Sequence, residues 1–268
     1  MTEKDFEIAE RFYDELYSDI KWIIRSARKN NIYLIMNGDI CSAILTSIVF
    51  NICKDNPNYN IINIIAHNDT ILFHDVVTLE ANSILISNAF NILTYPVDIS
   101  DQYKSMLKTF PDNKNITIDI KTHLYNQLTH TYINTLAAIN DAIIIDPISL
   151  TDICINGNIL FDRSPFLKIW KSTIESIAEM LIESDNILND TQKEYIKYIL
   201  DQSTLNNTKD IDLMLNRYLY IDGRDSIDSF VIHRPEYNNE TSINILNKTK
   251  KHIQYTEGTY YLYGDNDY

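Results

Sequence analysis

The chain has 268 residues, of which 45% are hydrophobic, and this is enough to build one globular domain with a sizeable core. The formal net charge of -14 argues against a nucleic-acid-binding or anionic-membrane surface, because phosphate groups require clusters of lysine and arginine. No uncharged apolar run reaches about 18 residues and the first residues are polar, so we expect a soluble, cytoplasmic protein without a signal peptide.

Hydrophobic periodicity predicts alternating helices and strands along the chain. Helical spacing of apolar residues predicts helices over residues 6–29, 40–54, 75–90, 118–138, 165–182 and 191–202. Short apolar runs predict strands over residues 32–36, 61–66, 93–98 and 142–146. This alternation predicts an α/β fold with a doubly wound, mostly parallel sheet flanked by helices. We expect a single domain over residues 1–268, in which about 222–268 is a polar, tyrosine-rich C-terminal extension.

The three cysteines, Cys41, Cys53 and Cys154, lie in apolar contexts and have no histidine or second cysteine at metal-binding spacing. We therefore expect buried free thiols rather than disulfides or metal ligands. The chain also has only five glycines, far below the usual share of about 7%. Nucleotide-binding α/β folds concentrate glycine where the backbone approaches phosphate, so this chain has lost much of that backbone chemistry.

The loop between the first predicted strand and the next predicted helix, residues 37–42, reads Asn-Gly-Asp-Ile-Cys-Ser. In a strand–loop–helix unit, backbone N–H groups at the helix N-terminus can hold a phosphate. Such a loop normally carries several glycines and no carboxylate directed at the anion. Here a single glycine, Gly38, is followed at once by Asp39. The place of the loop between a strand and a helix therefore suits phosphate binding, whereas its one glycine and its carboxylate do not.

The loop resembles that of the ammonia-dependent NAD synthetases, members of the ATP-pyrophosphatase family with an adenine nucleotide alpha-hydrolase-like fold, in which it reads Ser-Gly-Gly-x-Asp-Ser. Gly38 and Ser42 match this pattern, whereas Asn37 replaces the serine, Asp39 the second glycine and Cys41 the aspartate. The resemblance implies an NAD-synthetase-like, Rossmann-like fold in which these five residues form a degenerate ATP-binding loop. It also implies ATP and Mg²⁺ as the cofactors of an active member.

Further short stretches are similar to family motifs in the same order, over roughly residues 5 to 255. They are residues 95–100 (the family's Asp-Ile-Ser), 115–121 (Asn-Ile-x-Ala-Arg-x-Arg), 164–171 (Pro-Leu-x-x-Leu-x-Lys), 217–222 (Ser-Tyr-x-x-Ile-Asp) and 250–251 (His-Lys-Arg). For an active protein, the resemblance implies phosphate or substrate contacts by four lysines, Lys121, Lys171, Lys250 and Lys251. It implies Mg²⁺ binding by Asp152 and Asp162.

The departures from the family concentrate where the chemistry would occur. The family's Gly-Thr-x-Asn-Lys-Ser-Glu becomes a segment from Asp146 to Asp152, and its arginine pair becomes Asp119 and Lys121. Adenylation depends on N–H donors and cations that stabilise the transferring phosphoryl group, and the loss of one donor can cost about 10²-fold in rate. We therefore favour a catalytically inactive pseudoenzyme without confident catalytic residues or cofactors, in a structural or binding role.

Two other hypotheses stay open. The protein could be an active ammonia-dependent NAD synthetase, an ATP-dependent ligase that converts nicotinic acid adenine dinucleotide and ammonia into NAD. It could also be a sensor that binds such a nucleotide without turnover.

The resemblance implies a homodimer built across the helix at about 123–138, and a larger protein assembly is the alternative. The composition suggests an AT-rich bacterial virus, in which the protein would be a virion or assembly component located in the host cytoplasm or the virion.

Overall fold

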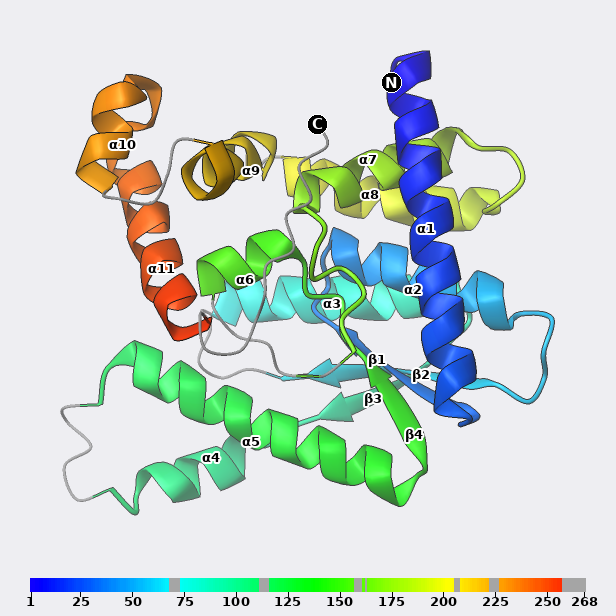
Figure 1. Ribbon diagram of the computed structural model, residues 1–268. Coiled ribbons are helices and arrows are strands. Elements are labelled where there is room, and N and C mark those ends of the chain that lie inside the picture. The colour runs from blue at the N-terminus through cyan, green and yellow to red at the C-terminus, as the bar shows by residue number, and fades with distance from the viewer. Residues whose placement is uncertain are drawn as a thin grey trace.

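Figure 1 shows the computed structural model of the chain. The structure describes residues 1–67, 73–110, 116–156, 161, 163–204, 208–221 and 227–256. Its four strands are β1 (Asn31–Met36), β2 (Asn60–Ala66), β3 (Leu93–Val97) and β4 (Ala142–Ile145), in the spatial order β3-β2-β1-β4. All of these strand pairs are parallel. The predicted parallel sheet is confirmed, and each predicted strand agrees with the observed one to within one residue at either end.

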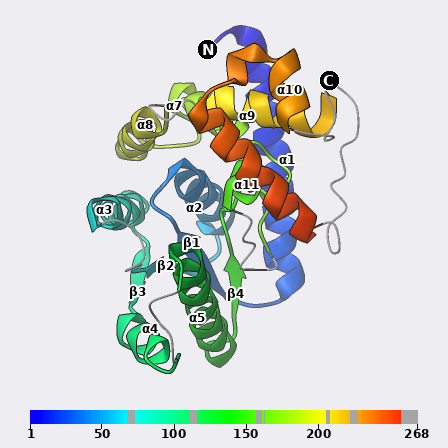
Figure 2. The same ribbon diagram turned by 90° about the vertical axis from the view of Figure 1, so that its left-hand side faces the viewer.

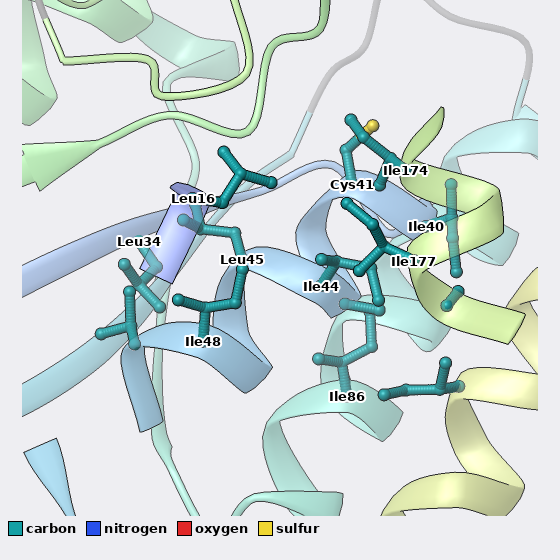
Figure 3. Packing of buried hydrophobic residues seen from close by; sticks show 14 of the residues in the cluster. Leu16, Leu34, Ile40, Cys41, Ile44, Leu45, Ile48, Ile86, Ile174 and Ile177 are labelled. Atoms are coloured by element: carbon teal, nitrogen blue, oxygen red, sulfur yellow. The ribbon is translucent and has the colours of Figure 1, made fainter. Parts of the chain in front are cut away.

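One face of the sheet is covered by two layers of helices. These helices are α1 (Glu3–Ala27), α2 (Ile40–Cys53), α3 (Phe73–Ala89), α7 (Lys171–Glu183) and α8 (Asp190–Thr204). Every residue of α2 from Ile40 to Val49 is buried, which is typical of a helix that is enclosed by other elements on all sides. Figure 3 shows Ile44, Leu45 and Ile48 of α2 among side chains from β1, α1 and α7. This helix is therefore the centre of the largest hydrophobic core.

The opposite face of the sheet is covered by α4 (Ser100–Leu107) and α5 (Ile118–Ile139), as Figure 2 shows. Tyr125 of α5 is buried there against Tyr103 of α4, with ring centroids 5.2 Å apart in an edge-to-face arrangement. Aromatic pairs of this geometry add about 0.5–1.5 kcal/mol to the burial of their surface. The sheet is thus sandwiched between helices, as the α/β alternation predicted.

A third core lies beyond the sheet and joins α6 to the elements from α9 to α11. It contains α6 (Leu150–Asn156), α9 (Thr208–Asn216), a π-helical turn (Arg217–Ile221), α10 (Ile227–His233), a short 3-10 helix (Pro235–Tyr237) and α11 (Glu240–Thr256). Tyr218 packs edge-to-face on Phe230, and Leu246 of α11 is fully buried. The described part of the segment 222–268 therefore contributes to a core, and α11 packs against α6. Tyr260, Tyr261, Tyr263 and Tyr268 lie outside the described residues.

Two sequence expectations about helices need correction. The helix predicted over 165–182 begins only at Lys171, because residues 164–170 form hydrogen-bonded turns and Trp170 has an extended backbone. Helices α4, α6, α9, α10 and α11 were not predicted, since each is short or polar and packs through a few apolar side chains.

Of the described helices, none is long and apolar enough to span a membrane. All three cysteines are buried and free, as expected.

Candidate functional site

The candidate site lies where the carboxyl ends of β1 and β4 meet the first turns of α2, α6 and α7. In the sheet, β1 stands between β2, which follows it in the chain, and β4, which follows β3. Such a switch point at the carboxyl ends of the strands is where open α/β sheets bind ligands. Residues 37–39 connect β1 to α2 at this point, residues 40–42 form the first turn of α2, and Asp146 follows β4 directly.

Asp39 is the N-cap residue of α2, and its carboxylate accepts hydrogen bonds from Ser42 in the first turn of this helix. Oδ1 of Asp39 accepts hydrogen bonds from the backbone N–H and from the Oγ hydroxyl of Ser42, both at 3.0 Å. The Ser42 hydroxyl also accepts from the backbone N–H of Asn37 at 2.9 Å. A carboxylate is favoured here because the helix dipole places partial positive charge at the N-terminus. A donor that the loop could offer to phosphate is therefore already bonded to the chain itself.

Lys171 neutralises this carboxylate from the first residue of α7. Its Nζ lies 2.8 Å from Oδ2 of Asp39 and 3.8 Å from Oδ1 of Asp152. Burial by itself would raise the pKa of Asp39, but the charge and hydrogen bond of Lys171 hold that pKa below its ordinary value. Burial acts to lower the pKa of Lys171, yet the nearby Asp39, Cys41 and Asp152 raise it above the usual value. Asp39 and Lys171 therefore form a partly buried ion pair at neutral pH.

Gly38 is held by packing against α3. Its φ of +70° is in the left-handed region, and a Cβ atom built on it would lie 2.1 Å from the carbonyl oxygen of Leu79. Nδ2 of the buried Asn82 donates to the Gly38 carbonyl at 3.1 Å and to Oε1 of Gln202 at 2.9 Å. The close backbone approach explains the glycine without a ligand, because only glycine fits both this φ and this space.

The first turn of α7, which carries Lys171, is capped by two other elements. The backbone N–H of Lys171 donates to Oγ1 of Thr151 at 2.9 Å, and that of Ser172 donates to Oδ2 of Asp212 at 2.8 Å. The Thr151 hydroxyl in turn donates to Oδ1 of Asp212 at 2.7 Å. Asp212, on α9, was missed by sequence reasoning, because no local pattern reveals a cap supplied from another helix.

Asp152 plays a similar capping role at the start of α6. Its Oδ2 accepts from the backbone N–H of Ser149 at 3.0 Å and from the Ser149 hydroxyl at 2.6 Å. The backbone N–H of Asp152 donates back to the Ser149 hydroxyl at 3.3 Å, and this reciprocal arrangement is a capping box. Each of the three helix N-termini that meet at the site, those of α2, α6 and α7, is thus bonded to a carboxylate of this chain.

Asp146 is the most deeply buried carboxyl group of the site, with 1% of its surface exposed. Burial and then the charge of Asp152, with a smaller contribution from Asp39, raise the pKa of Asp146 to about 8, although the N–H of Ile148 donates to it. Its Oδ2 has no hydrogen-bond partner among the described residues. A pKa of about 8 favours the protonated, neutral form of Asp146 at pH 7.

The donor set does not fit Mg²⁺. One carboxylate oxygen each from Asp39 and Asp152 and the sulfur of Cys41 lie within 4.8 Å of one another. Mg²⁺ requires near-octahedral oxygen ligands, whereas this group includes a thiol and Lys171 places an ammonium beside both carboxylates. Asp162, expected as the second Mg²⁺ ligand, lies outside the described residues.

The structure brings most of the predicted site residues together, and it separates others. The loop residues 37–42 meet Lys171 and Asp152 at the site. Lys121 lies in α5 and Lys250 in α11, and neither makes a hydrogen bond or ion pair with the loop within the described ranges. Lys251 lies near the end of α11, but its side chain is outside the described residues.

The fold is similar to that of solved NAD synthetases along nearly the whole chain. The NH3-dependent NAD synthetase from Campylobacter jejuni, in complex with the nitrate ion, has a TM-score of 0.63 and 11% identity over 94% of this chain and 97% of that chain. NMN synthetase from Francisella tularensis has a TM-score of 0.59 and 15% identity over 97% of this chain and 99% of that chain. Glutamine-dependent NAD+ synthetase from Acinetobacter baumannii, in complex with adenosine diphosphate, has a TM-score of 0.57 and 11% identity over 91% of this chain and 43% of that one.

No family model matches the chain, and no curated protein matches its sequence. At identities of 11% to 15% the structural likeness shows the fold alone. The chain therefore has an NAD-synthetase-like, Rossmann-like α/β fold, and the resemblance of its motifs predicted this fold correctly.

Proposed function

We propose that this chain is a pseudoenzyme, in which an NAD-synthetase-like scaffold serves a binding or structural role without turnover. The observation that carries the proposal is the carboxylate of Asp39, which accepts the N–H of Ser42 at the start of α2 and pairs with Lys171. The donor and the cation that an ATP phosphate would need are both engaged by the protein. Asp152 and Asp212 bind the starts of α6 and α7 in a similar way.

The energetic argument rests on preorganised charge. In enzymes that transfer phosphoryl or adenylyl groups, removal of a single stabilising donor can cost about 10²-fold in rate. A phosphate that approached within 4 Å of the Asp39 carboxylate would meet a repulsion of about 4 kcal/mol at an effective dielectric constant of 20. The ammonium of Lys171 offsets this repulsion only to the extent that it also approaches the phosphate, and it is held 2.8 Å from Oδ2 of Asp39. Adenylation at a useful rate would require both groups to rearrange.

The alternative is an active ammonia-dependent NAD synthetase, which uses ATP to amidate nicotinic acid adenine dinucleotide. Two observations favour it: the fold matches 97% of the chain of the Campylobacter jejuni enzyme, and the ammonium of Lys171 lies beside the loop. In this alternative Gly38 and Ser42 would bind phosphate. The ammonium of Lys171 would move away from Asp39 and contact pyrophosphate.

The decisive experiment measures pyrophosphate release and NAD formation by the purified protein with ATP, Mg²⁺, ammonia and nicotinic acid adenine dinucleotide. We expect neither product from folded protein. The matched control is Lys171→Met, because a contaminating enzyme would form NAD equally in both preparations. Turnover by the wild type that Lys171→Met abolishes would establish the active alternative.

The binding role has its own tests. Isothermal titration with NAD and with nicotinic acid adenine dinucleotide distinguishes the nucleotide sensor, which binds without turnover, from a protein-binding role. The role of virion or assembly component, suggested by composition, requires the chain to be found in purified virus particles. Its absence from particles would leave the pseudoenzyme proposal intact and exclude that version of it.

A further inference from the structure

Two surfaces outside the candidate site expose large apolar side chains beside charges of opposite sign. The first is the outer side of α1, which we call the α1 face. Residues 3–19 include seven acidic and two basic residues, and all seven acidic side chains are exposed. On the same helix Trp22 is 70% exposed, and Ile8 is exposed as well. These two residues are 14 positions apart, which places them on one stripe of the helix, so the α1 face is both acidic and apolar.

The second surface lies where α4 ends and α5 begins, and we call it the α4–α5 tip. The large apolar side chains exposed there are Met106, Phe110, Ile118 and Ile120. Lys104 in the last turn of α4 and Lys108 at its C-cap are exposed too. Residues 100–110 and 117–121 together carry three lysines and two aspartates, so the tip is slightly basic in a chain whose net charge is -14.

These two surfaces complement each other in charge and in apolar content. Single apolar residues on a surface are normal, whereas several that lie together mark a place where a partner binds. Tryptophan is also among the residues that contribute most to binding energy when a partner covers them. An acidic surface with a tryptophan fits a partner that offers lysines and apolar side chains, and the tip offers both. Helix α11 is also basic, but none of its described large apolar side chains is exposed.

The two surfaces cannot meet within one copy of the chain. Helix α1 covers one face of the sheet together with α2 and α7, whereas α4 and α5 cover the opposite face. Figure 1 shows α1 at the right of the molecule and the α4–α5 tip at its left. A contact between the α1 face and the tip therefore requires a second copy.

We propose that the α4–α5 tip of one copy docks on the α1 face of a second copy, so that Trp22 packs on the apolar side chains of the tip and the lysines of the tip face the carboxylates of α1. The contact joins two different surfaces, so each pair keeps one free tip and one free α1 face. Further copies can then add head to tail, into a ring or an open chain. This inference goes beyond the pseudoenzyme proposal and does not depend on it, because no nucleotide takes part. It also differs from a homodimer across α5, in which both copies use the same surface.

The test measures the mass of the purified full chain in solution by sedimentation velocity over a range of concentrations. At about 20 mM salt, charges act over roughly 20 Å, and the mass should rise past that of a dimer as the concentration increases. At about 0.5 M salt the range falls to roughly 4 Å, and this growth should disappear. A contact through an uncharged surface would not show this dependence on salt.

Two variants each disable one surface. Trp22→Lys removes the ring from the α1 face and turns a like charge towards the lysines of the tip. Ile118→Glu places a carboxylate opposite the acidic residues of α1, and a carboxylate is favourable for folding at the first residue of α5. Each variant should stop growth past a dimer at low salt. Tyr198→Lys and Leu213→Glu are the matched controls, because they make the same changes at exposed positions of α8 and α9 and should grow like the wild type.

A mixture of the two variants tests whether the contact joins different surfaces. Trp22→Lys keeps an intact tip and Ile118→Glu keeps an intact α1 face. Dye-labelled Trp22→Lys should therefore bind unlabelled Ile118→Glu at least about 10-fold more tightly than it binds unlabelled Trp22→Lys. A contact between identical surfaces predicts no such preference.

Three results would overturn the proposal: wild-type protein that never exceeds the mass of a dimer at low salt, growth that persists in either variant, or no preference in the mixture. Binding of the wild type to phosphatidylserine vesicles that Ile118→Glu abolishes, without growth in mass, would assign the tip to an anionic membrane instead. Circular dichroism confirms that each variant is folded. These readouts are independent of the NAD assay, so the two proposals can fail separately.

Discussion

The tightest steric constraint on a single residue of the site is at Gly38. Alanine at this position would combine a φ of +70° with a Cβ only 2.1 Å from the Leu79 carbonyl oxygen. We expect Gly38→Ala to lower the free energy of unfolding by about 2 kcal/mol or more, because backbone strain and a backbone clash act together. Urea unfolding measures the loss. The neighbouring exposed residue provides the control, since Asn37→Ala should change stability by less than about 0.5 kcal/mol. A small loss for Gly38→Ala would show that α3 can move away from the loop.

A second prediction concerns the buried acid Asp146. Its pKa is raised to about 8 in the folded protein, whereas an unfolded chain has an aspartate pKa of about 3.9. Between these values the folded state holds a proton that the unfolded state has lost, so stability decreases as the pH rises from 4 towards 8. The Asp146→Asn variant lacks this titration. Its melting temperature should therefore exceed that of the wild type at pH 7, and the difference should shrink towards pH 4. A difference that does not change with pH would contradict the prediction.

At the scale of elements, α7 depends on a cap from α9. Asp212 accepts the backbone N–H of Ser172 and the hydroxyl of Thr151, so it joins the third core to the helix that carries Lys171. We expect Asp212→Ala to lower the free energy of unfolding by about 1–2 kcal/mol, as for other lost N-caps. The same change should accelerate amide hydrogen exchange at Ser172.

The control for this prediction is on the same helix. Asp210 is exposed, so Asp210→Ala should leave both stability and exchange close to wild type. Equal effects of the two substitutions would show that the charge of α9, rather than the cap, supports α7.

At the scale of the whole molecule, self-association has to overcome a net charge of -14 on each copy. From Thr122 to Ile139, α5 has no Asp, Glu, Lys or Arg, and its end exposes Ile139 at 75%. The neighbouring β3 exposes Leu93 at 71%, and Tyr95 of β3 contacts Tyr132 of α5. A second copy that packs on this neutral face avoids the repulsion between like charges, which favours it as the surface of the expected homodimer.

Light scattering coupled to size-exclusion chromatography tests this expectation. Ile139→Lys should shift the protein from dimer to monomer, because the new charge would be buried in the contact. Ile84→Lys, at an exposed isoleucine of α3 on the other side of the sheet, should leave the oligomeric state unchanged. A wild-type protein that is monomeric at every concentration, or equal shifts from both variants, would contradict a dimer through this face.

Local patterns determined much of this protein. The apolar run before Asn37 is a buried strand and the run after Asp39 is a buried helix, because burial on all sides requires apolar residues at every position. The same reasoning predicted the parallel sheet, and the order of short motifs predicted the NAD-synthetase-like fold. Residues 37–42 alone also indicated that a carboxylate, that of Asp39, stands at a helix N-terminus where a phosphate could otherwise bind.

Tertiary structure decided what the site residues contact. Asp39 and Lys171 are 132 positions apart, so no local pattern could predict their ion pair. The cap from Asp212, the close approach of Leu79 to Gly38 and the helices of the third core likewise depend on which segments become neighbours. Periodicity records whether a side chain is buried, because burial is set by the face of the element. It does not record which partner a buried charge will have, because that partner is chosen by the packing of distant elements.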